Sequence, residues 1–217
     1  MTTPDHVHMH DNDPAVAAWR WRIPLILAVW AAGVAVASGF GLVAALPLPL
    51  VAALVVLGIA APVVAYAHIP TLQTFLGGRP LNDFTVFHLW RIGAAAAFFY
   101  YGAQEALPAA FVRHAAWGDL LAGLLVLPVL LIPARGYGKY VAFHAIGFAD
   151  FVLAVGTGLW FSLADDPKMA TIATFPLALV PLFGVGVSGA SHLIAFDVVR
   201  RRRRGAALDA PGAGGAQ

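Results

Sequence analysis

The chain has 217 residues, of which 60% are hydrophobic and 11% are charged, whereas ordinary soluble domains are roughly 45–50% apolar and about 25% charged. This excess of apolar residues excludes an ordinary soluble domain and predicts a protein whose main partner is the lipid bilayer. The absence of cysteine excludes disulfides and thiolate metal sites, and the net charge of +2 includes one compact basic run at 200–204 rather than a spread basic face, which argues against nucleic-acid binding.

Six apolar runs follow one another along the chain, each near the length of about 20 residues that a membrane-spanning helix needs. They are residues 23–43, 48–67, 84–104, 118–133, 141–163 and 171–199. The polar segment 1–20 is expected to be a disordered tail, and the segment 201–217 is expected to be a basic stop-transfer run followed by a disordered tail that begins at Gly205. The sequence therefore predicts an all-α, polytopic membrane helix bundle over 21–200 with six transmembrane helices.

The first tail carries three alternating histidines, His6, His8 and His10, followed by aspartates. Imidazole and carboxylate groups bind Cu²⁺, Ni²⁺ and Zn²⁺. A flexible tail, however, offers no second layer of residues to orient these ligands. Weak, adventitious metal binding is the expectation for this segment.

The basic residues predict the orientation of the six runs, because cytoplasmic loops collect Lys and Arg. With both termini in the cytoplasm, the inner side holds eleven basic residues and the outer side holds only Arg113 and Lys168. Five or seven crossings would place the 200–204 run or the pair Arg20 and Arg22 on the wrong side. We therefore expect a multi-pass protein with a cytoplasmic N-terminus and a cytoplasmic C-terminus.

Charged side chains inside the predicted spans are candidate sites, because a charge at the bilayer centre costs about 2.5–3.5 kcal/mol on insertion scales. Asp150 falls near the middle of the fifth run, and Arg91 lies seven residues into the third. We expect the two to approach each other, either as a structural ion pair or as part of a proton or substrate relay. Ala154 and Gly158 follow at steps of four and allow another helix close. Asp119, near the start of the fourth run, is expected to cap that helix.

Histidines form a second candidate group. By the predicted topology, four of them fall in the cytoplasmic half of the bundle: His68, His88, His144 and His192. Two facing imidazoles could ligate a b-type haem, and two of them with Asp150 or Asp197 could ligate a metal ion. The alternative is that each imidazole binds a neighbouring backbone carbonyl.

The sixth run has an unusual backbone composition ahead of His192. Its helix-breaking residues are Pro176, Pro181, Gly184, Gly186 and Gly189. Broken helices line substrate sites in transporters, but proline and glycine are also commoner in membrane helices than in soluble ones. Both interpretations remain open from the sequence.

Several short strings between residues 87 and 197 form a recognisable set. They are Arg91-x-Gly93, Gly102 with Leu107-Pro108, Gly118-Asp119-x-x-x-Gly123, Gly147-x-x-Asp150, and Pro176 to Pro181 ending in Ser191-His192-Leu193. Together they resemble an uncharacterised family of small bacterial multi-span membrane proteins, in which an asparagine tends to stand where this chain has His144. The resemblance implies a six-helix protein of the bacterial cytoplasmic (inner) membrane and supplies no activity.

The chain lacks a P-loop, a zinc-protease signature and a paired nucleophile and base, which favours a non-enzymatic protein. The leading hypothesis is a protein that binds or transports a small solute or a proton through Arg91, Asp150 and His192, with His144 and His88 as further candidates. One alternative is a membrane redox protein that binds haem b through two histidines. Another is an accessory subunit whose small-residue strips pack against other membrane helices or a second copy.

Overall fold

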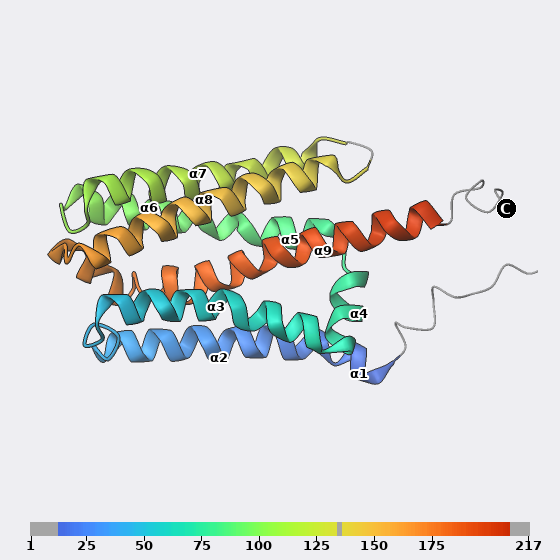
Figure 1. The fold of residues 1–217 in the computed structure, drawn as a ribbon, viewed down its shortest axis with the longest axis horizontal. Helices are drawn as coiled ribbons and strands as arrows, with labels where there is room; N and C mark the ends of the chain where they lie inside the picture. The colour runs from blue at the N-terminus through green and yellow to red at the C-terminus, as the bar shows by residue number, and fades with distance from the viewer. Residues whose placement is uncertain (1–12, 134–135, 209–217) are drawn as a thin grey trace, which may run out of the picture.

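The computed structural model describes residues 13–133 and 136–208, which are helical and contain no β-strand (Figure 1). This confirms the predicted all-α class. Five helical segments in the described ranges are long and apolar enough to cross a membrane, judged by length and composition. They correspond to five of the six predicted runs.

The N-terminal part is a helical hairpin followed by two short helices. α1 (Pro14–Ala17) leads into α2 (Trp19–Gly39), and the chain returns as α3 (Leu48–His68). α4 (Pro70–Gly78) and α5 (Leu81–Val86) follow. Prolines occupy the first turns of α3 and α4, where their missing N–H groups leave no hydrogen bond unmade, so they start these helices rather than break them.

The predicted third run is helical but not a single α-helix. α5 continues through η1 (Phe87–Leu89), a 3₁₀ turn, into α6 (Trp90–Ala103). The 3₁₀ turn divides the run, so neither α-helix alone has the length of a span. In Figure 1 the run nevertheless extends along the bundle behind α8.

The C-terminal half contains the longest helices. α7 (Ala109–Leu131) and α8 (Gly138–Leu163) form a second hairpin. The 3₁₀ helix η2 (Pro167–Ala173) then leads to a π-helical turn, η3 (Val180–Val185), and to α9 (Gly186–Leu208). α9 lies in the middle of the bundle, between the α2–α3 hairpin and the layer of α6, α7 and α8 (Figure 1).

Four predicted boundaries were wrong. The tail predicted over 1–20 ends earlier, because α1 begins at Pro14 and α2 begins at Trp19. α7 begins at Ala109, directly after Pro108, and not at residue 118, because Arg113 and His114 belong to the helix rather than to a loop. The sixth run does not begin at residue 171, since η2 and a non-helical connection precede Val180. At its other end the helix continues through the basic run at 200–204 to Leu208, within the segment predicted as a disordered tail.

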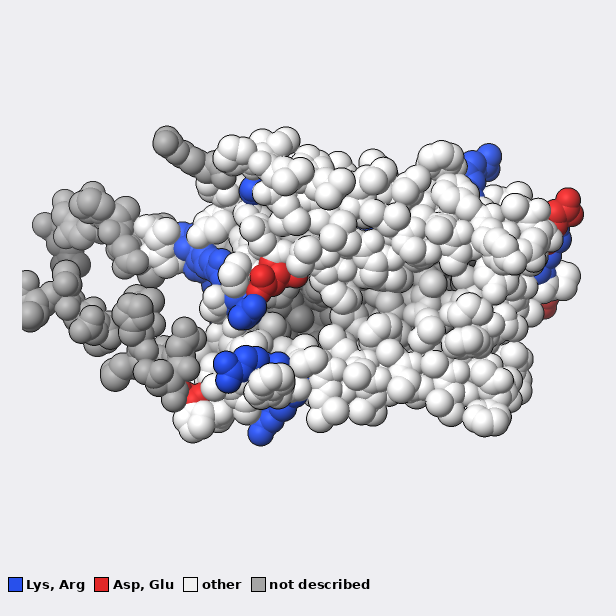
Figure 2. Space-filling view, turned by 180° about the vertical axis from the view of Figure 1, so that it is seen from behind, with Lys and Arg blue, Asp and Glu red and all other residues white. Residues whose placement is uncertain are grey.

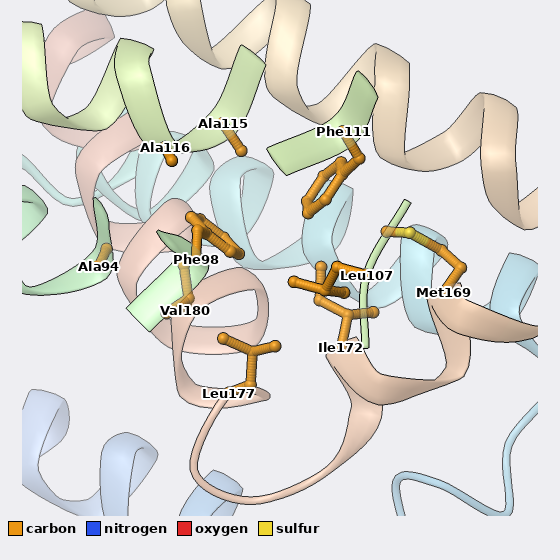
Figure 3. Packing of buried hydrophobic residues seen from close by; sticks show 10 residues of the cluster. All are labelled: Ala94, Phe98, Leu107, Phe111, Ala115, Ala116, Met169, Ile172, Leu177 and Val180. Carbon is orange, nitrogen blue, oxygen red and sulfur yellow. The ribbon is translucent and has the colours of Figure 1, made fainter. Parts of the chain in front are cut away.

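A large cluster of buried apolar side chains lies near the end of the bundle opposite the described ends of the chain (Figure 1). There, Phe98 of α6 and Phe111 of α7 meet edge to face with ring centroids 5.4 Å apart. Figure 3 shows Leu107, Met169 and Leu177 closing around this pair from the loop after α6, from η2 and from the segment before η3. This cluster fixes α7 beside α6. It thereby sets the rotation of both helices about their axes, and with it the direction of the polar side chains described below.

The outer surface divides by polarity. Figure 2 shows Lys, Arg, Asp and Glu gathered at the two ends of the molecule, with an uncharged surface between them. Large apolar side chains of α2 are exposed on that surface, including Leu25 and Val29, each more than 60% exposed. A cavity of about 1230 Å³ opens between α2, α3, α4, α5 and α9, and Figure 2 shows this face hollowed between the two layers of helices.

Candidate functional site

Arg91 is the most deeply buried charge in the described residues, with no exposed surface. It lies in the first turn of α6, where its Nε donates a 2.7 Å hydrogen bond to Oδ1 of Asp119 and its Nη2 donates to Oδ2 of Asp150. The ring of Phe151 covers the guanidinium at 4.3 Å. The predicted approach of Arg91 and Asp150 is therefore confirmed. Asp119, predicted as a helix cap, instead lies inside α7 and is the second partner of Arg91.

Glycines make room for this ion-pair network. A Cβ atom at Gly118 of α7 would overlap the carboxylate of Asp150, and a Cβ at Gly123 would lie 2.6 Å from Cγ1 of Ile92. The bare backbone of α7 thus lets α8 and α6 approach closely enough for both carboxylates to reach Arg91. A guanidinium cannot shed its proton inside a protein, so a buried arginine depends on such partners.

Three predicted histidines converge beside the ion pairs. His88 of η1, His144 of α8 and His192 of α9 are each at most 1% exposed. One ring nitrogen from each lies within 4.8 Å of the other two. Nδ1 of His144 is 2.8 Å from Nδ1 of His192, and the ring of His88 stacks on that of His192 with centroids 4.1 Å apart.

Four buried nitrogen atoms of these residues have no hydrogen-bond partner within the described part of the chain. They are His88 Nδ1, Arg91 Nη1, His144 Nε2 and His192 Nε2. An unsatisfied buried polar group costs about 1–3 kcal/mol, so such atoms are few in native proteins and commonly mark a site for an ion, a water molecule or a ligand.

The ion pairs and the histidines form one continuous group. The position of a Cβ on Gly147 of α8 is 2.7 Å from Nε2 of His192 and 3.5 Å from Nη1 of Arg91, so both nitrogens face this glycine. We refer to the six side chains together as the polar centre. Its members are His88, Arg91, Asp119, His144, Asp150 and His192.

Other candidate residues lie elsewhere. His68 is exposed at the end of α3. Nδ1 of His114 lies 3.2 Å from Oγ1 of Thr157. The carboxylate of Asp197 accepts a hydrogen bond from the hydroxyl of Tyr66 and forms an ion pair with Arg201. His6, His8 and His10 lie outside the described residues.

The glycines of the sixth run serve close helix packing. Gly184 faces the ring of Trp90 with no room for a side chain, and a Cβ at Gly186 would lie 2.7 Å from the ring of Trp30. The indole N–H of Trp90 also donates a 2.9 Å hydrogen bond to Ser188. These contacts hold η3 and α9 against α6 and α2. Because Pro181 lies near the N-terminus of η3, it does not interrupt a helix that has already begun.

Sequence reasoning missed three contributors to the polar centre: the pairing of Asp119, the space at Gly147, and the hydroxyl of Ser191, which lies 2.9 Å from Nε2 of His88. A signal was present in the strings Gly118-Asp119 and Gly147-x-x-Asp150. In each string a carboxylate of the polar centre comes with a glycine that receives a polar side chain from another helix.

Comparison with protein families matches residues 45–200 to the model named Domain of unknown function (DUF8737). The chain belongs to this family. No curated protein and no solved structure matches the chain. The DUF8737 region contains the whole polar centre, together with α3 to α8, whereas α1 and α2 precede it.

Proposed function

We propose that this DUF8737 protein is a six-span integral membrane protein that binds a small cation, either a proton or a metal ion, at the polar centre and moves it across the membrane. The run from α5 to α6 is the third span in this proposal. Its continuous helical backbone supports that assignment, and the eleven-to-two division of basic residues supports cytoplasmic termini. The sequence resemblance supports the bacterial cytoplasmic membrane as its location.

The observation that carries the proposal is the convergence of six ionisable side chains, from η1, α6, α7, α8 and α9, in the interior of the bundle. Ionisable residues at such depth in a membrane protein mark ion or proton pathways. With neutral imidazoles, one arginine and two aspartates give the centre a formal charge of −1. A cation therefore complements it, and each neutral imidazole has one ring nitrogen whose lone pair can receive one.

The geometry does not favour the haem alternative. A porphyrin would have to lie between its two axial imidazoles. His144 and His192 are instead joined by a direct 2.8 Å contact, and His88 and His192 are stacked face to face, so no macrocycle fits between either pair. The accessory-subunit alternative has no specific support either, because the exposed apolar side chains of α2 fit lipid as well as a partner helix.

Flux into proteoliposomes tests the proposal. Purified full-length protein is reconstituted with a pH-sensitive or a zinc-sensitive dye inside the vesicles, and a proton or Zn²⁺ gradient is imposed. We expect wild-type protein to carry at least one of the two ions faster than protein-free vesicles. Asp150→Asn should reduce this flux to the protein-free level while Arg91 keeps Asp119 as its partner.

Asp165→Asn is the matched control, because Asp165 is exposed after α8, lies outside the polar centre and does not line the large cavity, and asparagine tolerates its positive φ. Its flux should equal that of the wild type. Wild-type vesicles that pass neither ion faster than protein-free vesicles would overturn the proposal, and so would an Asp150→Asn variant with full flux. A visible spectrum of the same preparation checks for a haem band.

A further inference from the structure

We infer that His88, His144 and His192 form a binding site for one divalent first-row transition metal ion, held by one ring nitrogen of each. The inference builds on the proposed function, because it uses the same polar centre and names the class of cation. The three imidazoles bind the ion directly. Arg91 and its two aspartates surround the site and set its local charge.

The spacing of the rings fits a shared ion. Two nitrogen ligands about 2.0–2.1 Å from one zinc ion lie about 3.4 Å apart when the coordination is tetrahedral. His144 and His192 already bring their Nδ1 atoms to 2.8 Å, where one proton lies between them. An ion that takes this position displaces the proton, which moves to Nε2 of the same ring, and the two rings rotate outward to make room for the ion. The third imidazole lies within 4.8 Å.

The contacts of Ser191 suit a tautomer of His88 whose Nδ1 is free for a metal ion. When Ser191 Oγ donates its only proton to the backbone oxygen of Ser188 at 3.0 Å, it accepts a proton from Nε2 of His88 at 2.9 Å. In that tautomer Nδ1 of His88 carries a lone pair, and this buried atom has no partner in the described residues. Metal-ligating histidines characteristically donate their second ring N–H to an acceptor in this way.

The ligand set selects the class of ion. Imidazole nitrogens suit Zn²⁺, Cu²⁺, Ni²⁺ and Co²⁺, whereas Mg²⁺ and Ca²⁺ require oxygen ligands. Three protein ligands also leave a coordination position open, as in sites where an ion exchanges a ligand rather than serving a purely structural role. The carboxylates of Asp119 and Asp150 outnumber the single guanidinium beside the site, so the local charge favours a divalent ion.

The large cavity comes within one side chain of the site. Ser191 lines the cavity of about 1230 Å³ between α2 and α9, and its hydroxyl contacts His88. The histidines themselves are buried and do not line the cavity, so an ion in the cavity would have to pass Ser191 to reach them.

Cobalt titration tests the inference, because Co²⁺ bound to nitrogen ligands gives visible absorption bands that free aqueous Co²⁺ lacks. Full-length protein, purified in detergent without metal-affinity resin, is titrated with Co²⁺ and then with Zn²⁺ as a competitor. We expect one Co²⁺ per chain, displaced by Zn²⁺. His144→Asn should abolish the bands with an unchanged helical circular dichroism spectrum, since asparagine keeps a polar group of similar size at this position.

Two control variants locate the ion. His114→Asn, away from the polar centre, and a variant with His6, His8 and His10 all changed to alanine should both retain the bands. Absence of bands in the wild type, bands that survive in His144→Asn, or bands lost with the three tail histidines would each overturn the inference. Metal binding without ion flux would leave this site standing and remove the transport proposal. Ion flux by a wild-type protein that shows no cobalt bands would leave the transport proposal standing and remove this site.

Discussion

Gly147 is the residue at which the two halves of the polar centre meet. Its missing side chain lets His192 of α9 lie against the backbone of α8, and a Cβ atom there would be 2.5 Å from Cε1 of His192. Closely packed interiors resist added volume, because neighbouring side chains must leave their preferred rotamers. The imidazole of His192 on α9 can therefore keep its position only while residue 147 of α8 is a glycine.

Replacement of Gly147 by alanine should destabilise the protein by about 1–3 kcal/mol, the usual range for overpacking. Gly156→Ala on the same helix is the control, since a Cβ there has nothing within 4 Å and alanine restricts the unfolded chain more than glycine does. Thermal unfolding in detergent should thus show a lowered Tm for Gly147→Ala and an equal or raised Tm for Gly156→Ala. Equal Tm values for the two variants would contradict this packing argument.

At the scale of elements, η3 and α9 are aligned with α6 by a close contact at Gly184 and by a hydrogen bond to Ser188. The ring of Trp90 fills the space left by Gly184, and its N–H reaches Ser188. One turn further along α9, Ser191 contacts His88 and His192 lies near Arg91. The indole therefore sets the register in which the two helices bring their polar side chains together.

Trp90→Ala should accordingly lower the free energy of unfolding by about 3 kcal/mol, the lower end of the range for core aromatic side chains, because Trp90 is only partly buried. The exposed Trp160 of α8 provides the comparison, because its ring is 70% exposed and its removal opens no internal cavity. Unfolding of the two variants by a denaturing detergent, followed by circular dichroism, measures the difference. If Trp160→Ala were as destabilising as Trp90→Ala, the packing of the Trp90 ring against Gly184 would not be the contact that holds α9 in place.

The positions of the helices could be predicted from the sequence better than the polar centre could. Lipid demands long apolar runs, so composition alone located five candidate spans. The start of α7 was misplaced because Arg113, His114 and Asp119 were taken as marks of the membrane boundary. His88, His144 and His192 come together only when their separate helices have the right rotation and register. Close packing at Gly118, Gly147 and Gly184 sets that rotation and register. Hydropathy along the sequence carries no information about them.

At the scale of the whole molecule, the two described ends of the chain lie at the same end of the bundle, together with α4 (Figure 1). The segment after α8, which includes η2 and within it Lys168, lies at the opposite end (Figure 1). An even number of crossings produces this arrangement, which is compatible with the proposed topology. Because the chain contains no cysteine, each end can be examined with one introduced thiol.

Labelling with a membrane-impermeant maleimide on intact bacterial cells, with the outer membrane permeabilised, should modify Lys168→Cys. Gly78→Cys and Gly205→Cys should react only after the cytoplasmic membrane is opened, since basic flanks are retained in the cytoplasm. All three positions are exposed on the protein, so burial does not limit their labelling. If the run from α5 to α6 did not cross, Gly205→Cys would react from outside and Lys168→Cys would be protected.

The two carboxylates that hold Arg91 come 28 and 59 residues later in the chain. During synthesis, the segment with this arginine leaves the ribosome before either aspartate, and a lone arginine at the centre of a hydrophobic helix makes insertion unfavourable by about 2.5–3.5 kcal/mol. In the proposed topology, the α5–α6 run therefore gains its two counter-charges only when α7 and α8 have been synthesised. The ion pairs would then favour assembly of these three segments together.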